Sequence, residues 1–377
     1  MVLFPKVQVV TAEPFQFPLP NGFPFPNDQA LEELFIRAGG NFTNAPLAPK
    51  FDSDSLTSWK LQAFNEFFEV AFFTQLIANI SRREPGYDLD SPAREYILDS
   101  LTTIQAQEEM HAYNANDAVR YFDNGSHIFP CTYQFPVSDF ESAIALAQTF
   151  TDMYIGLLAN IQQLTARNLG TDSNSIVYVL AQALGQEGQQ SGWFRSLQHK
   201  PPSAEPFLTS STRELAFSWI QRFIVPGSCS NMEVIPLRIF PRLDATVEKG
   251  DRGKGGEEEN ILVTLRVPGP VDPSSQSVAY VNGALVPTVV PFEVRNTSGC
   301  GHGHEGVLVK NWDDTREAVR GTAACIQSTE IVASLPYRHN VMHGMILATI
   351  VHNGATFITA EDVTNATVYG PAVIELS

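Results

Sequence analysis

The sequence predicts an α+β protein of several domains, in which a bundle of helices is followed by a β-sandwich-like C-terminal domain. Between about residues 51 and 226, apolar residues recur at helical spacing and the segments begin and end at helix start and stop signals. After Pro226-Gly227, short β-branched runs alternate with turn residues up to residue 377. A chain of 377 residues is long enough for about two domains.

Residues 1–50 form a Pro/Phe-rich N-terminal arm. Eight prolines within this segment exclude long helices. We expect either an ordered arm or a disordered tail.

Five helices are expected in residues 51–226, near 55–81, 92–122, 139–168, 174–198 and 211–224. Their start signals are a Ser91-Pro92 cap and two capping boxes, Ser138 with Glu141 and Ser211 with Glu214. Four of the five segments are long enough to build a four-helix bundle.

The C-terminal part, residues 227–377, contains runs that are typical of strands. They lie at 261–267, 277–281, 288–294 and 345–351. Asn282-Gly283 and Asn353-Gly354 are strong hairpin signals. We therefore expect a β-sandwich.

Charge and hydropathy exclude two classes of partner. The chain has 24 Lys and Arg against 41 Asp and Glu, a net charge of −17, which disfavours nucleic acid. No uninterrupted apolar run is long enough for a membrane-spanning helix. The pattern leaves the oligomeric state open.

Cysteines and glycosylation signals favour secretion over a cytoplasmic location, although no signal peptide is visible at the N-terminus. The four cysteines allow three pairings, one of which joins Cys300 and Cys325. Five Asn-x-Ser/Thr sites occur, at Asn41, Asn79, Asn124, Asn296 and Asn365.

The second predicted helix places a carboxylate and an imidazole on its apolar face. The apolar row from Ile97 to Ile104 continues at helical spacing to Glu108 and His111. Glu109 follows on a face that we expect to be wetter. Burying a lone carboxylate is costly unless a cation, a proton or hydrogen bonds compensate it.

The first helix is apolar on nearly every side, which predicts that it is buried. Glu69 lies between the directions of Phe72 and Leu76, and Glu66 lies one turn before it. These two carboxylates are therefore also candidates for a buried site.

The fourth helix repeats the arrangement of the second, with Glu187 and Gln190 where an E-x-x-H motif would stand. On the third helix the corresponding face carries Thr151 and Tyr154, with Asp152 one step away. Alternating Glu and E-x-x-H helices are the pattern of di-iron and di-manganese carboxylate bundles.

Two positions of a full ligand set are occupied by Thr151 and Gln190, so we expect at most a mononuclear Fe or Mn site. The expected metal ligands are Glu69, Glu108, His111 and Glu187, supported by Gln190, Tyr154 and Glu66.

Four helical segments of the sequence resemble segments of a known family. They are FNEFFEVAFFTQL, TIQAQEEMHAYNA, LAQTFTDMYIGLL and ALGQEGQQSGWFRSL. Over about residues 30–225 the chain resembles the fungal ferritin-like proteins described as stress-response or late sexual development proteins. The resemblance implies a ferritin-like four-helix bundle, with Glu69, Glu108 and His111 as relics of a metal site. It implies a fold more than a reaction, and it does not imply iron storage.

Three functions remain open. The first is oxidative chemistry on a small apolar molecule at the degenerate metal site. The second is a non-catalytic, secreted stress or developmental scaffold, in which the carboxyls form a metal-free polar network. The third is a metal-independent enzyme of the cyclase or isomerase type, with an apolar acidic pocket and Glu108, Tyr154 and Glu187 as catalytic candidates.

A second histidine group lies in the C-terminal part. His302 and His304 have the spacing of one strand face, and His339 and His343 follow later. Four imidazoles can bind Zn or Cu. The alternative is that these histidines are exposed or hydrogen-bonded.

Overall fold

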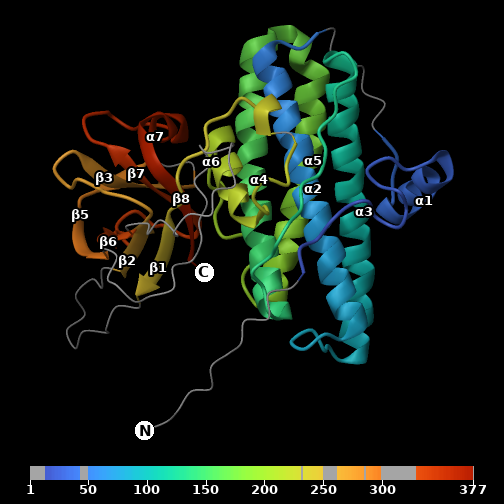
Figure 1. Ribbon diagram of the computed structural model, residues 1–377, viewed down its shortest axis with the longest axis horizontal. Coiled ribbons are helices and arrows are strands. Elements are labelled where there is room, and N and C mark those ends of the chain that lie inside the picture. Colours follow the sequence, from blue (N-terminus) through green and yellow to red (C-terminus); the bar gives the residue numbers. More distant parts are fainter. Residues whose placement is uncertain are drawn as a thin grey trace, which may run out of the picture. The chain divides into compact units, whose positions relative to one another are not determined.

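The computed structural model describes residues 13–42, 50–230, 232–248, 261–283, 286–298 and 328–376. Four long helices account for the helical bundle region and antiparallel sheets follow in the C-terminal part, which confirms the predicted fold class (Figure 1). By their contacts the residues fall into two compact units. The first comprises residues 1–44, 56–143 and 223–236, and the second comprises residues 45–55, 144–222 and 237–377.

Helices α1 (Asp28–Ala38) and α3 (Ser91–Phe122) belong to the first unit, as does α2 (Ser53–Arg82) from residue 56 onward. α2 is buried along most of its length, as its Phe-rich sequence predicts. α1 packs on α3 through Leu34, Ala38 and Ala106 (Figure 1). Within residues 13–42 the N-terminal arm is thus ordered, and α1 occupies the proline-free stretch after Pro26.

Residues 13–26 are held by aromatic packing. Phe17 and Phe23 lie 6.1 and 5.7 Å from Phe67 of α2, measured between ring centroids. Phe15 pairs through its backbone with Tyr133. The arm is therefore part of the core of this unit.

A disulfide joins Cys131 to Cys229, also within the first unit. The sequence left three pairings open. This disulfide selects the one in which neither Cys131 nor Cys229 is bonded to Cys300 or Cys325. Cys300 and Cys325 themselves lie outside the described residues.

Helices α4 (Phe140–Leu169), α5 (Asn174–Leu197) and α6 (Arg213–Ile220) follow, with short 3-10 helices at Gly170–Ser173, Gln221–Phe223 and Met232–Val234. Their bounds agree with the predicted helices to within a few residues. The caps are shifted by one residue: Asp139 accepts from the Ser142 N–H, and Thr212 accepts from the Leu215 N–H.

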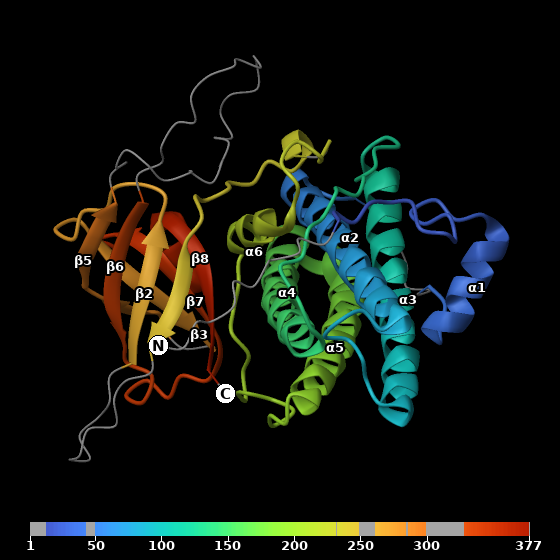
Figure 2. The same ribbon diagram turned by 60° about the horizontal axis from the view of Figure 1, so that its bottom comes forward.

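Two four-stranded antiparallel sheets form the β-sandwich (Figure 2). One has the order β1 (Asp244–Glu248), β2 (Ile261–Val267), β6 (Ser328–Leu335), β5 (Phe292–Ser298). The other has the order β4 (Thr288–Val290), β3 (Gln276–Asn282), β7 (Gly344–His352), β8 (Thr367–Leu376). A single apolar core includes Val263, Leu265 and Ile331 of the first sheet and Tyr280, Ile346 and Ile350 of the second.

Two local expectations in this part were wrong. The run 288–294, predicted as one strand, is divided by Pro291 into β4 and β5, which belong to different sheets. After Asn353-Gly354 the chain does not return as a tight hairpin but passes through α7 (Ala360–Ala366) before β8. None of the described helices is both long and apolar enough to span a bilayer.

Candidate metal centre

The candidate centre begins with two neighbouring helices of the first unit. Glu66 of α2 and Glu108 of α3 are 2% and 0% exposed. Both stand on helices whose apolar residues direct them into the core. A carboxylate in such a place requires compensation by a proton, a cation or hydrogen bonds.

His111 stands between these two carboxylates. Its Nδ1 lies 2.9 Å from Oε2 of Glu108, three residues earlier on α3, and 3.7 Å from Oε2 of Glu66. The His111 side chain is 24% exposed, whereas those of both carboxylates are at most 3% exposed. The imidazole is thus the solvent-facing member, and it compensates at most one negative charge.

Glu187 of α5, which is 0% exposed, completes a group of four. One ligand atom each from Glu66, Glu108, His111 and Glu187 lies within 4.8 Å of the others. Carboxylate oxygens and an imidazole nitrogen form a donor set that suits Fe or Mn. The residues present therefore fit the ion that the sequence pattern implies.

Glu66, expected only to support the ligands, is in this group, and Glu69, expected to be a ligand, is not. The Glu69 carboxylate is fully buried and accepts a hydrogen bond of 2.7 Å from Asn65 Nδ2, one turn earlier on α2. Both glutamates lie on a helix that is buried on nearly all sides, so the apolar pattern cannot distinguish them.

The other residues expected near the metal are buried on their helices. Thr151 and Tyr154 lie on α4, and Gln190 lies on α5. None of them offers the carboxylate or imidazole that a second metal ion would need.

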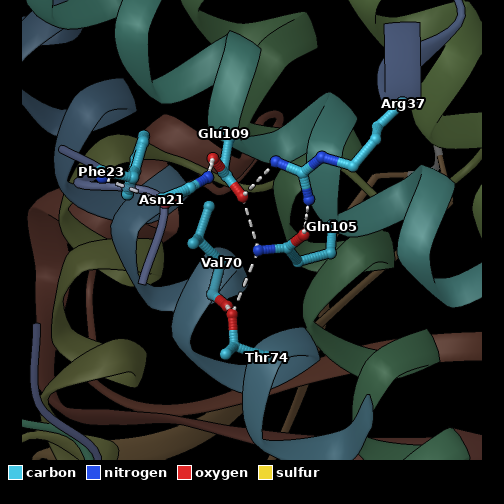
Figure 3. Close-up of polar contacts among 7 residues, drawn as sticks. All are labelled: Asn21, Phe23, Arg37, Val70, Thr74, Gln105 and Glu109. Atoms are coloured by element: carbon cyan, nitrogen blue, oxygen red, sulfur yellow. Dashed lines mark hydrogen bonds and ion pairs between the residues drawn. The ribbon is translucent and has the colours of Figure 1, made fainter. Parts of the chain in front are cut away.

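Glu109 was expected on a wetter face, and this expectation was wrong, because the Glu109 side chain is fully buried (Figure 3). Asn21 of the N-terminal arm donates 2.7 Å to Oε2, and Gln105 donates 2.6 Å to Oε1. Arg37 of α1 lies 3.5 Å from Oε1. Burial raises the pKa of Glu109, and these three partners act against the rise.

The Glu109 network continues to α2. Gln105 Nε2 also donates to Thr74 Oγ1 at 3.2 Å, and Thr74 in turn donates to the Val70 carbonyl (Figure 3). Both carboxylate oxygens of Glu109 accept hydrogen bonds in this network, which joins α1 and the arm to α2 and α3.

A second acidic cluster, buried at Asp152 and partly buried at Glu375, lies in the second unit. Asp152 of α4 accepts from Ser191 Oγ at 2.5 Å and from Gln148 Nε2 at 3.2 Å. The same Gln148 nitrogen donates to Glu375 Oε2 of β8 at 3.3 Å. Burial raises the pKa of Asp152, and burial together with Asp152 raises the pKa of Glu375 to about 8.

Of the four histidines of the second histidine group, the structure describes two. His339 and His343 are exposed. His302 and His304 lie outside the described residues, so metal binding by this group stays a prediction.

Two comparisons with known proteins complete the description. A search of curated proteins found no match. The model of a family described as "Ferritin-like domain" matches residues 60–200. That range contains all four members of the Glu/His group. The helical part of the chain, from α2 to α5, is therefore similar to ferritin-like domains.

Proposed function

We propose that Glu66, Glu108, His111 and Glu187 bind a single Fe or Mn ion. The proposal rests on one observation: ligand atoms of three buried carboxylates and one imidazole lie close together. Three negative charges in an apolar interior are costly, and a divalent cation compensates them more fully than one imidazolium does. With Thr151 and Gln190 on the remaining helix positions, the donor set suffices for one ion only.

A bound ion of this kind would supply redox chemistry with oxygen or peroxide, and the candidate substrate is a small apolar molecule. The chain contributes the surroundings. The buried helices exclude water from the carboxylates, and the partly exposed His111 marks the side from which small molecules approach. Asn65 donates a hydrogen bond to Glu69, a further buried carboxylate on the same helix as Glu66.

Metal analysis of protein purified without chelator tests the proposal. We expect about one equivalent of Fe or Mn, and less than about a tenth of an equivalent would contradict the site. Glu66→Gln and His111→Ala should each abolish retention. Glu69→Gln is the matched control and should keep the ion, because Glu69 lies outside the group.

Metal-free protein would favour the scaffold alternative. In that case Glu108→Leu should leave the free energy of unfolding unchanged or raise it, since an apolar residue of similar size often replaces a buried charge without loss. For the metal-independent enzyme, Glu108, Tyr154 and Glu187 remain the catalytic candidates.

We further propose that the chain is secreted. The Cys131–Cys229 disulfide supports an oxidising compartment, and the sequon residue Asn124 is exposed in a turn. Expression in a secretory host followed by glycosidase treatment should lower the mass of the product, and an unchanged mass would oppose the proposal.

The finer assignment, to the fungal stress-response or sexual development proteins, is likewise a proposal. It rests on the four helix segments that resemble that group. Transcript levels that rise under stress or during sexual development would support it, and constant levels would oppose it.

A further inference from the structure

A cavity of about 220 Å³ lies in the first unit, between the N-terminal arm and helices α2 and α3. Its inner wall includes Phe23 of the arm, Phe67 of α2 and Ala112 of α3, all of them buried. Two of these are aromatic rings, whose centroids are 5.7 Å apart. These three buried lining residues are apolar and two of them are aromatic, while other lining residues are polar.

The mouth of the cavity is also aromatic. Phe25 is 57% exposed, and its ring lies 5.9 Å from that of His127 and 6.0 Å from that of Phe129. Phe25 and His127 line the cavity. Contiguous exposed apolar groups often mark binding sites, and here three rings gather at the mouth of a cavity.

One edge of the cavity is polar. Asp117 and Arg120 form an ion pair on α3, one turn apart, and both line the cavity. Tyr113 and Asn116 are further polar lining residues of this helix, and Asn116 bonds both the N–H and the carbonyl of Ile128. The ion pair offers a ligand both a donor and an acceptor, and the side chains of Tyr113 and His127 also line the cavity.

Size and charge restrict the ligand further. An apolar cavity of roughly 150 Å³ accepts benzene, so about 220 Å³ accepts one substituted ring or a small fused pair. Aromatic walls favour a ring in edge-to-face contact over an aliphatic body. The net charge of −17 disfavours an anion, and the Arg120 charge is already matched by Asp117.

We infer that this cavity binds a small, neutral, electron-rich aromatic compound of the phenol or indole class. The ring lies against Phe23, Phe67 and Phe25, and its hydroxyl or N–H meets the Asp117–Arg120 pair.

The position of the cavity relates this ligand to the candidate centre. Phe67 directly follows Glu66 on α2, and Ala112 directly follows His111 on α3. Two of the proposed ligands, Glu66 and His111, are thus direct sequence neighbours of residues in the cavity wall. Binding of the aromatic compound needs no metal, whereas its role as a substrate rests on the proposed function.

Titration of the full chain with 4-methylphenol and with indole tests the inference by calorimetry. The matched control ligand is 4-methylcyclohexanol, which has the same size and hydroxyl but no aromatic ring. We expect saturable binding of both aromatic probes and weaker binding of the control by about tenfold. Absence of saturable binding, or equal affinity for the control, would overturn the inference.

Variants of lining residues test whether the ligand binds in this cavity. Phe25→Ala should weaken 4-methylphenol binding by about tenfold, and Phe207→Ala, which removes another exposed ring outside the cavity, should not change it. Ala112→Leu should abolish binding by filling the space, provided that its thermal unfolding shows a folded protein. Unchanged binding in Phe25→Ala would overturn the assignment.

Metal content measured on the same samples separates the two proposals. A metal-free sample that binds 4-methylphenol supports the cavity and contradicts the metal site. A metal-containing sample that does not bind the probes supports the metal site and contradicts the cavity.

Discussion

Gly156→Ala is expected to destabilise the protein strongly, although alanine favours helices. Gly156 lies within α4, where the backbone of residues 209–211 runs against the helix. An added Cβ would overlap the Thr209 carbonyl oxygen and would lie 2.8 Å from the Ser211 nitrogen. Real Cβ contacts of this length to backbone atoms are essentially never seen.

The opposing segment cannot easily move away. The Thr209 hydroxyl donates to the Met345 carbonyl of β7 at 2.5 Å and accepts from the Gly283 N–H at 2.8 Å. Overpacking against such a fixed neighbour costs about 1–3 kcal/mol or more. The gain from replacing glycine by alanine in a helix is at most about 1 kcal/mol, so we expect a net loss of up to about 2 kcal/mol.

Gly185→Ala is the matched control. Gly185 lies in α5, is exposed, and has open space where the Cβ would stand. This variant should gain about 0.5–1 kcal/mol from helix propensity alone. The measurement is the free energy of unfolding from urea titrations of both variants. Stabilities that agree within about 0.5 kcal/mol would refute the reasoning, because propensity would then decide both sites.

Three further predictions concern charges and the disulfide. The pKa of Glu375 is raised from 4.5 to about 8, so between these pH values Glu375 keeps its proton in the folded state and loses it in the unfolded state. The free energy of unfolding therefore falls as pH rises from about 4.5 through 8, by up to ~5 kcal/mol. Glu375→Gln should remove this decline in urea titrations near pH 5 and near pH 9, and an unchanged decline would contradict it. Reducing Cys131–Cys229, which are 98 residues apart, should lower the free energy of unfolding by about 4–5 kcal/mol in the same assay, and a loss under about 1 kcal/mol would oppose this estimate. Arg37→Ala should lower the free energy of unfolding by about 1–2 kcal/mol, because it removes a cation beside the buried Glu109 carboxylate; this figure is reduced for the one-third exposure of Arg37. In a double-mutant cycle, the loss should be smaller when Glu109 is already replaced by Gln.

The long helices were predictable because their apolar residues keep helical spacing over 24 or more residues. β8 was not predicted, since Gly370 and Pro371 in its middle argue against a strand. The structure resolves the conflict, because β8 lies at the edge of its sheet, where a missing N–H is tolerated. Helix α1 escaped prediction because it stands alone within a proline-rich arm.

The candidate site was predictable where one helix supplies two groups in a fixed relation, as Glu108 and His111 do. The burial of Glu109 was not, because the groups that cover it, Asn21 and Arg37, come from 88 and 72 residues earlier in the chain. Local periodicity carries no information on which distant segment packs against a helix face.

The Cys131–Cys229 bond closes a covalent ring that encloses α4, α5 and α6 in the sequence. A single protease cut inside that ring opens it but releases no fragment. The nicked chain would migrate as one species on a non-reducing gel and divide into two only after a thiol is added. Such a ring lets a cut chain keep its helices covalently attached.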